Sequence, residues 1–225
     1  MSSRELTGPP LALAPFARVM GAVCETIDAH ADELTELDRV IGDADHGLNM
    51  KRGFAAIEAR MDALSAMPLS AAITESGKTL VMTVGGASGP LFGTLLMRFG
   101  TELGSGPLAQ ATAGVSPAPL PTRSQLARAL QVALDAVKAR GKAVRGQKTM
   151  IDVLEPVAQL LASSEPVTPA QISACASAAA QATVPMKAER GRASFLGERS
   201  VGHLDPGARS TELIIKAIVE VIEGE

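Results

Sequence analysis

The sequence of 225 residues contains neither tryptophan nor tyrosine, and its five phenylalanines make up the whole aromatic content of 2%. Runs of β-branched residues are also rare, whereas alanine and leucine dominate the apolar 46% of the chain. Because alanine and leucine favour helices, while β-branched and aromatic residues favour strands, this balance predicts close-packed helices and no sheet. The length suits one large domain, so we expect a single domain over residues 1–225 with a flexible start at residues 1–10.

Cysteines, net charge and long apolar runs are scarce as well. The two cysteines, Cys24 and Cys175, lie in apolar helical patterns, which favours buried free thiols over a disulfide framework. A net charge of −3 and a pI near 5.7 argue against non-specific binding of nucleic acid. No apolar run reaches the roughly 20 residues that a membrane span needs. We therefore expect a cytoplasmic protein that binds neither nucleic acid nor a membrane.

Apolar residues recur at helical spacing along most of the chain. Their pattern predicts eight helices, over about residues 11–37, 49–64, 69–83, 91–103, 123–140, 150–162, 169–188 and 210–222. Residues 104–121, rich in Gly, Ala, Ser and Pro, predict a surface connection, and residues 189–209 predict a long loop. Since most other connections are short, consecutive helices should be antiparallel, and we expect an all-α bundle or barrel.

The chain concentrates carboxylates between the first two predicted helices. Asp38, Asp43 and Asp45 share one short stretch, and Gly42 and Gly47 flank the last two. Like charges so close together repel one another unless a cation lies among them. Carboxylate oxygens just before a helix suit Mg²⁺, which binds proteins through a few carboxylates and shares itself with phosphates. The helix N-terminus also favours an anion, so the stretch indicates a Mg²⁺-nucleotide site.

A simpler explanation of the same stretch stays open. Aspartate is common at helix N-caps and turns, and such a string taken alone is more often a solvated loop. An EF-hand is excluded, because the further oxygen ligands and the closing glutamate of its loop are missing. Covalent catalysis by this chain is not expected either, because the sequence offers no Ser-His-Asp or Cys-His arrangement.

Two further loops carry groups that can bind phosphate. The glycine-rich residues 85–90 lead into a helix, and their N–H groups and the Ser88 hydroxyl can hold phosphate oxygens, although a tight helix–helix turn explains them equally well. Residues 189–209 include three arginines, among them Arg192, which can neutralise a phosphate chain. This long segment predicts a lid over a nucleotide, with an ordinary surface loop as the alternative.

Another predicted helix begins within residues 146–152. The first four of these residues, Gly-Gln-Lys-Thr, resemble the end of a Walker A motif. A P-loop is rejected, because its spaced glycines and preceding strand are absent. We expect Lys148 to be solvated or close to phosphate, and Asp152 to complement the dipole at the start of the helix. Met150 can pack against a flat base, although a role as core filler explains it on sequence alone.

Three segments in this order resemble the L subunits of dihydroxyacetone kinases of the phosphotransferase-system-dependent type. They are residues 41–50, 85–93 and 191–208, and the resemblance extends over nearly the whole chain. It implies a barrel of eight antiparallel helices that binds ADP or ATP and two Mg²⁺ ions at one end. Two features depart from the family pattern, namely Gln147, where Asp is frequent, and the long proline-rich connection at residues 104–121.

The resemblance also implies roles for single residues. Asp38, Asp43 and Asp45 would coordinate the Mg²⁺ ions. The residues that would contact the nucleotide are His46, Gly47, Leu48, Asn49, Ala87, Ser88, Gly141, Met150, Arg192, Asp205, Pro206 and Gly207. No catalytic nucleophile is expected in this chain, since a partner K subunit would supply the histidine that holds the substrate.

The implied activity is a phosphoryl relay. A phosphohistidine of an M subunit would phosphorylate bound ADP, and the resulting ATP would phosphorylate dihydroxyacetone on the K subunit. Two alternatives stay open. One is an L subunit of an ATP-dependent kinase for dihydroxyacetone or another small ketose. The other is a nucleotide-sensing protein that regulates a binding partner, which the loss of an aspartate would have favoured; all three aspartates are present. A purely structural bundle would not need them.

Overall fold

The computed structural model describes residues 16–105 and 121–224, and within these ranges it contains helices but no strand. The helices are α1 (Phe16–Ala29), α2 (Ala31–Ile41), α3 (His46–Glu58), α4 (Met61–Ser65), α5 (Leu69–Thr83), α6 (Ser88–Ser105), α8 (Arg123–Gly141), α9 (Ile151–Leu161), α10 (Pro169–Gln181), the 3₁₀ helix η1 (Arg192–Ser200) and α11 (Pro206–Glu223). The prediction of an all-α fold is confirmed. The expected flexible start and most of the 104–121 connection lie outside the described residues.

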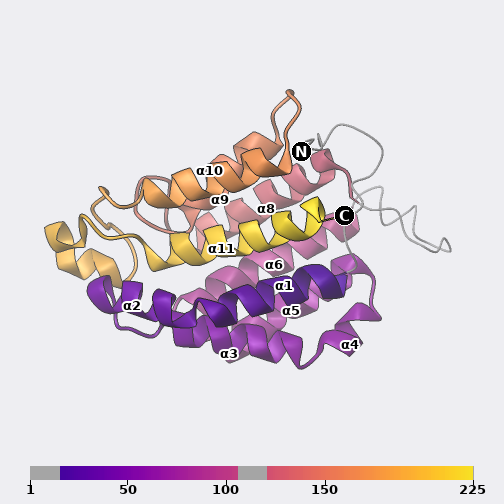
Figure 1. Ribbon diagram of the computed structural model, residues 1–225, viewed down its shortest axis with the longest axis horizontal. Helices are drawn as coiled ribbons and strands as arrows, with labels where there is room; N and C mark the ends of the chain where they lie inside the picture. Colours follow the sequence, from indigo (N-terminus) through magenta and orange to yellow (C-terminus); the bar gives the residue numbers. More distant parts are fainter. Residues whose placement is uncertain (1–15, 106–120, 225) are drawn as a thin grey trace.

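Eight of these helices form a closed ring. Around the ring, α1 packs against α3, α3 against α5, α5 against α6, α6 against α8, α8 against α9, α9 against α10, α10 against α11, and α11 against α1 again. Neighbours in the ring run in opposite directions along the long axis of the molecule (Figure 1). The predicted antiparallel barrel is therefore confirmed. This alternation places the N-termini of α3, α6, α9 and α11 at one end, on the left of Figure 1.

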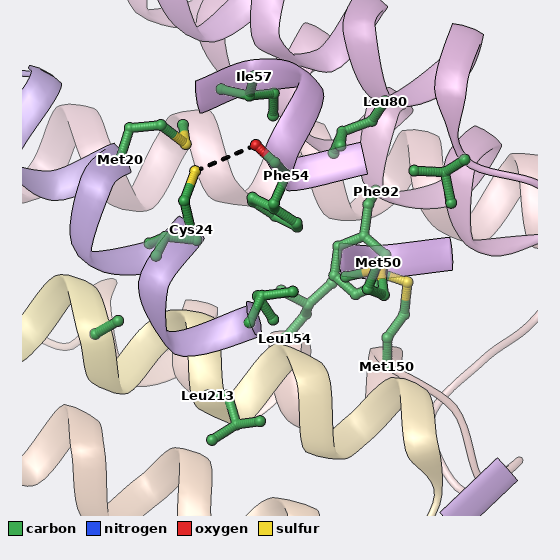
Figure 2. Close-up of a cluster of buried hydrophobic side chains, with 14 of the residues drawn as sticks. Met20, Cys24, Met50, Phe54, Ile57, Leu80, Phe92, Met150, Leu154 and Leu213 are labelled. Atoms are coloured by element: carbon green, nitrogen blue, oxygen red, sulfur yellow. Dashed lines mark hydrogen bonds between the residues drawn. The ribbon is translucent and has the colours of Figure 1, made fainter. Parts of the chain in front are cut away.

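Apolar side chains from around the ring fill its interior, as Figure 2 shows. Met20 and Cys24 of α1 meet Phe54 of α3, and the Cys24 thiol donates a hydrogen bond to the Phe54 carbonyl at 3.4 Å. Burial raises the pKa of Cys24 to about 12, so this thiol is unreactive at neutral pH. Cys175 is also a free thiol, as predicted, but it is only partly buried. A partly open cavity of about 240 Å³, lined by apolar side chains, lies within the barrel. None of the described helices is both long and apolar enough to cross a bilayer.

Four predicted elements differ from the structure, and one of them is the helix predicted over residues 169–188, since α10 ends at Gln181. The first predicted helix breaks at His30, and α2 leaves the ring to pack against α3, α11 and η1. An ion pair between Glu33 of α2 and Arg209 of α11, 2.7 Å long, holds α2 in that position. The second predicted helix breaks between α3 and α4 at residues 59–60. The predicted loop at 189–209 contains η1, which bends at Gly197, where φ is +57°.

Candidate functional site

Three aspartates meet where α2 ends and α3 begins. Asp38 lies near the end of α2, Asp43 in the connecting loop, and Asp45 at the N-cap position of α3. One carboxylate oxygen from each of the three lies within 4.8 Å of the other two. Asp38 is buried, Asp45 is half-buried and Asp43 is exposed, so the cluster opens to solvent on one side.

The backbone around the cluster depends on residues with little or no side chain. A Cβ atom on Gly42 would lie 1.9 Å from Oδ1 of Asp38, so only glycine lets the loop pass the buried carboxylate. A Cβ atom on Gly47 would lie 2.0 Å from the carbonyl oxygen of Ala31, so glycine also lets α3 begin directly against α2. Ala44 has a φ of +59°, a left-handed conformation that costs a non-glycine residue about 1 kcal/mol. The surrounding contacts therefore hold this loop in one shape.

The buried Asp38 fixes the start of α3. Its Oδ2 accepts hydrogen bonds from the N–H groups of Asp45 at 2.8 Å and of His46 at 3.1 Å, so it caps a helix to which it does not belong. Burial and then the charge of Asp43 raise the pKa of Asp45, opposed in part by a hydrogen bond from the Asn49 side chain. A cation among the three carboxylates would relieve this repulsion, so the donor set fits a divalent metal ion.

The glycine-rich turn lies beside this cluster. A Cβ atom on Gly86, where φ is +64°, would lie 3.8 Å from Oδ2 of Asp45 and 3.9 Å from Nδ2 of Asn49. The turn passes through Ala87 into α6, which begins at Ser88. Each helix N-terminus at this end of the barrel offers N–H groups without an intrahelical partner and the positive end of a dipole, an arrangement that suits phosphate groups.

His46 joins three helix starts. Its Nδ1 lies 2.9 Å from Oγ of Ser88 at the start of α6, and its Nε2 lies 3.0 Å from Oγ of Ser210 in α11. The side chain is buried, and burial lowers its pKa to about 4, so the ring is neutral at pH 7. Both ring nitrogens are thus engaged by hydroxyl groups. The imidazole therefore fixes the helix ends relative to one another, and its expected contact with the nucleotide stays a prediction.

Gly141 and Met150 lie at the same end of the barrel. Gly141, the last residue of α8, packs closely against α6. The backbone nitrogen of Met150 lies 3.6 Å from the position of a Cβ atom on Gly207, so Met150 adjoins the turn before α11. The Met150 side chain is buried in the core together with Met50 and Phe92 (Figure 2). The Met150 side chain therefore belongs to the apolar core beneath this end of the barrel.

The turn that starts α11 is capped by its own aspartate. Oδ2 of Asp205 accepts a hydrogen bond from the N–H of Ala208 at 2.7 Å, and Pro206 occupies the first helical position, where it loses no intrahelical bond. Asp205 is buried, and burial raises its pKa to about 7. This turn is consequently a rigid part of the site's wall.

The 3₁₀ helix η1 lies beside the exposed Asp43 of the aspartate cluster. Arg192, its first residue, forms an ion pair with Asp43 at 3.1 Å. Ala193 and Leu196 pack against Ile41, the last residue of α2, and so dock η1 onto the end of the helix that carries Asp38. The structure therefore brings the predicted lid and the predicted metal ligands together.

A family model described as the DAK2 domain matches residues 40–220. The chain belongs to the DAK2-domain family. The resemblance read from the sequence is thereby confirmed. In Escherichia coli K12, the PEP-dependent dihydroxyacetone kinase, ADP-binding subunit DhaL, is 42% identical over 200 residues, which cover 86% of this chain and 90% of the relative. The PEP-dependent dihydroxyacetone kinase 1, ADP-binding subunit DhaL, of Listeria innocua is 37% identical over 196 residues, which cover 87% and 90%.

Some larger proteins are similar to this chain over only part of their length. The D-erythrulose kinase of Mycolicibacterium smegmatis is 34% identical over 214 residues, which cover 92% of this chain but 35% of that protein. The crystal structure of the dihydroxyacetone kinase of C. freundii in its native form superimposes with a TM-score of 0.69 at 25% identity, covering 98% of this chain and 36% of that one. The same enzyme in complex with AMP-PNP and Mg²⁺ gives a TM-score of 0.68.

Ser210 and Lys148 have roles in this DAK2 domain that the sequence did not indicate. Ser210 carries no local signal, because its role depends on His46, which is far away in the sequence. Lys148 was expected to be solvated or near phosphate, and this is wrong: its side chain is 1% exposed, and its ammonium group lies among backbone carbonyls. Asp152 does more than complement the helix dipole, because it accepts hydrogen bonds from the N–H groups of Gly146 at 2.5 Å and Thr149 at 2.8 Å.

Proposed function

We propose that this chain is the ADP-binding subunit of a dihydroxyacetone kinase. It relays a phosphoryl group from a phosphohistidine donor, the M subunit, through bound nucleotide to dihydroxyacetone on the K subunit. The observation that carries the proposal is the convergence of three aspartates at the barrel end where four helices begin. Relatives matched over about nine-tenths of their length are named as ADP-binding subunits, which supports the same activity for this chain.

Asp38, Asp43 and Asp45 are the proposed ligands of two Mg²⁺ ions. Their oxygens form a compact hard-ligand set, and burial together with the charge of Asp43 raises the pKa of Asp45, an effect that a bound cation would oppose. When bound, Mg²⁺ neutralises phosphate charge during transfer. The C. freundii enzyme, whose fold this chain shares, has been crystallised with AMP-PNP and Mg²⁺, which supports a nucleotide and magnesium here.

The proposed nucleotide contacts divide into three groups. The N-termini of α3 and α6, with Gly47, Leu48, Asn49, Ala87 and Ser88, face the phosphates. Gly141, Met150 and the turn Asp205, Pro206 and Gly207 form the wall for the base. Arg192, which pairs with Asp43, adds positive charge beside the phosphates from η1. His46 acts indirectly, because its hydrogen bonds hold the starts of α3, α6 and α11 together. This chain therefore works by binding, orienting and charge compensation.

The K subunit is proposed to dock on an apolar rim around the site, formed by Val40, Leu48, Val81, Met82, Val144, Phe195 and Val201. These are exposed large apolar residues of the described chain, and they lie in or close to α2, α3, α5, α8 and η1. Among the exposed large apolar residues, only Met67 lies elsewhere in that part of the chain, between α4 and α5. Exposed apolar area gathered around one site marks a surface for a protein partner. A phosphoryl acceptor must also approach from this side.

One experiment separates the relay from its nearest alternative. We would purify the chain without added nucleotide, denature it and identify what is released. Stoichiometric ADP supports a bound cofactor that is rephosphorylated in place. An empty protein that binds ATP reversibly with Mg²⁺ supports an ATP-dependent kinase, an alternative favoured by the similarity to the D-erythrulose kinase. A folded protein that binds no nucleotide with Mg²⁺ present contradicts both.

A further inference from the structure

Lys148 is a buried cation outside the aspartate cluster. Its side chain is 1% exposed, and Nζ donates hydrogen bonds to the carbonyl oxygens of Thr183 at 2.7 Å, Met186 at 3.2 Å and His203. A fourth carbonyl, that of Val184, lies 3.4 Å away. An ammonium group has three donors, so these carbonyls satisfy all of them. The lysine thus sits in a site built entirely from backbone oxygens.

The positions of these carbonyls along the chain are the informative feature. Thr183 and Met186 follow the end of α10, whereas His203 lies just before α11. One ammonium group therefore ties together both ends of residues 183–203, which we call the lid segment. The lid segment contains η1, and at its far side Arg192 forms the ion pair with Asp43. The lysine itself belongs to the connection before α9, a different part of the barrel end.

The backbone at Lys148 supports a specific use of this side chain. Its φ is +62°, in the left-handed region that favours glycine, so a lysine is kept there against a local cost. Burial of an ammonium group is also unfavourable unless it is paired and hydrogen-bonded. Burial lowers the pKa of Lys148, and the neighbouring carboxylates Asp205 and Asp152 oppose this by favouring the charged form. Asp205 caps α11, and Asp152 accepts hydrogen bonds from the connection before α9, so the cation lies where the lid meets both helix starts.

A neighbouring residue reinforces the same junction. The carbonyl oxygen of Gln147 accepts a hydrogen bond from the N–H of Glu189 at 3.3 Å. Its side-chain amide donates to the Glu189 carboxylate at 3.0 Å and accepts from Arg190 at 3.2 Å. These contacts are more exposed than those of Lys148 and so contribute less. The connection before α9 therefore contacts the lid segment through two consecutive residues, Gln147 and Lys148.

We propose that Lys148 is a positioning residue for the bound nucleotide: its ammonium group fastens both ends of the lid segment to the start of α9 and thereby holds η1 and Arg192 over the aspartate cluster. The inference rests on the proposed function, because it assumes a nucleotide beneath the lid. Loss of the ammonium group leaves buried carbonyls without a donor at both ends of the segment. The lid segment then opens more often, while the ring of helices keeps its own contacts.

The test compares Lys148→Met with Lys142→Met. Methionine keeps most of the apolar stem of lysine but provides no donor. Lys142 lies in the same connection, also has a positive φ, of +49°, and is exposed, so it controls for the backbone conformation and the lost charge. Two quantities are measured: amide hydrogen exchange of residues 183–203 in the metal- and nucleotide-free protein, and the dissociation rate of a fluorescent ADP analogue in Mg²⁺.

For Lys148→Met we expect faster exchange confined to the lid segment and ADP dissociation accelerated by roughly tenfold or more, as the loss of a charge-assisted buried hydrogen bond implies. Lys142→Met should match the parent in both. Lys148→Gly relieves the positive φ but removes the ammonium group, so we expect it to release ADP as fast as the methionine variant. If Lys148→Met does not fold, Lys148→Arg, whose wider guanidinium does not fit among the same carbonyls, is expected to raise lid exchange likewise.

Three results overturn the proposal. They are an unchanged ADP dissociation rate, a rise in exchange spread evenly over all helices, and a glycine variant that behaves like the parent. The exchange measurement does not involve nucleotide. If the parent protein binds no ADP in Mg²⁺, that result alone contradicts the proposed function. The amide hydrogen exchange of residues 183–203 still shows whether Lys148 fastens the lid segment.

Discussion

Single side chains decide how the helix ends of this barrel meet, and His46 is the clearest case. Its folded pKa of about 4 lies below the ordinary value of 6.5 because the ring is buried. Between these pH values the unfolded chain binds a proton that the folded chain does not. The stability that His46 contributes is therefore fully present above pH 6.5 and is lost as the pH falls toward 4. The loss between pH 7.5 and pH 5 amounts to about 2 kcal/mol.

The prediction is tested by urea unfolding of the metal- and nucleotide-free protein and of His46→Gln at these two pH values. Glutamine can hydrogen-bond to both hydroxyls but does not titrate. Asp205, whose raised pKa of about 7 makes stability fall as pH rises from 4 to 7, acts in the opposite direction in both proteins. The difference in the free energy of unfolding between the parent and His46→Gln isolates the contribution of His46. We expect this difference to shrink by about 2 kcal/mol at the lower pH. A difference independent of pH contradicts a buried neutral ring.

Replacing Asp45 is expected to weaken ligand binding without lowering the stability of the metal-free protein. The raised pKa of Asp45 shows that the folded protein disfavours its charge, so Asp45→Asn should leave the metal-free protein at least as stable as the parent. Asparagine is also a good N-cap residue. Binding of Mg²⁺-ADP should weaken by a hundredfold or so, as for loss of one charged ligand worth about 3 kcal/mol.

The measurements for Asp45→Asn are chemical unfolding and calorimetric titration with ADP in Mg²⁺. Asp62→Asn is the matched control, because Asp62 is an exposed aspartate in α4, which lies away from the site. Affinity retained in the Asp45 variant removes this residue from the metal site. A variant that is less stable and binds less tightly points instead to a structural role.

At the scale of elements, η1 presents an exposed aromatic side chain beside the site. Phe195 is 85% exposed, an unusual state for a phenylalanine in a chain with so few aromatics. We expect Phe195→Ser to leave ADP binding unchanged. It should raise the concentration of K subunit needed for half-maximal phosphorylation of dihydroxyacetone by tenfold or more, as for an aromatic anchor at an interface.

The phosphorylation assay with K and M subunits checks this by titrating the K subunit at fixed M subunit. Met67→Ser is the control, since Met67 is 36% exposed but lies in the connection between α4 and α5. Titration curves of Phe195→Ser and the parent that superimpose would place the K subunit elsewhere.

Helical periodicity identified most elements, because each long helix buries one face along its whole length. The segment 69–83 was predicted to its ends and corresponds to α5. The break at His30 was not predictable in this way, since Ala29 and Ala31 favour helix and no glycine or proline stands near. Contacts with α3, α11 and η1 bend the chain there. Tertiary packing also makes a 3₁₀ helix of a segment that looks like a loop.

For the molecule as a whole, the sequence located the aspartates but not the supports around them. Asp38, Asp43 and Asp45 are close in the chain, so their convergence followed from a short loop. His46 with Ser210, and Lys148 with the lid segment, are pairs distant in sequence. Buried lysines are rare enough that a solvated side chain was the better expectation for Lys148. The closure of the ring, which returns α11 to α1, brings His46 to Ser210, and the packing of α9, α10 and α11 against one another brings Lys148 to the lid segment.

Because the site is built from helix starts distributed around the ring, its occupation should stabilise the entire barrel. A ligand that binds only the folded state at a hundred times its Kd adds about 2.7 kcal/mol, which raises Tm by roughly 5–10 °C for a chain of this length. Repulsion among three carboxylates opposes a nucleotide alone, so we expect this shift with Mg²⁺ and ADP together and little with ADP and a chelator. Thermal unfolding under the four combinations of metal and nucleotide measures it. An equal shift by ADP without metal would show that the aspartates do not bind the nucleotide through a cation.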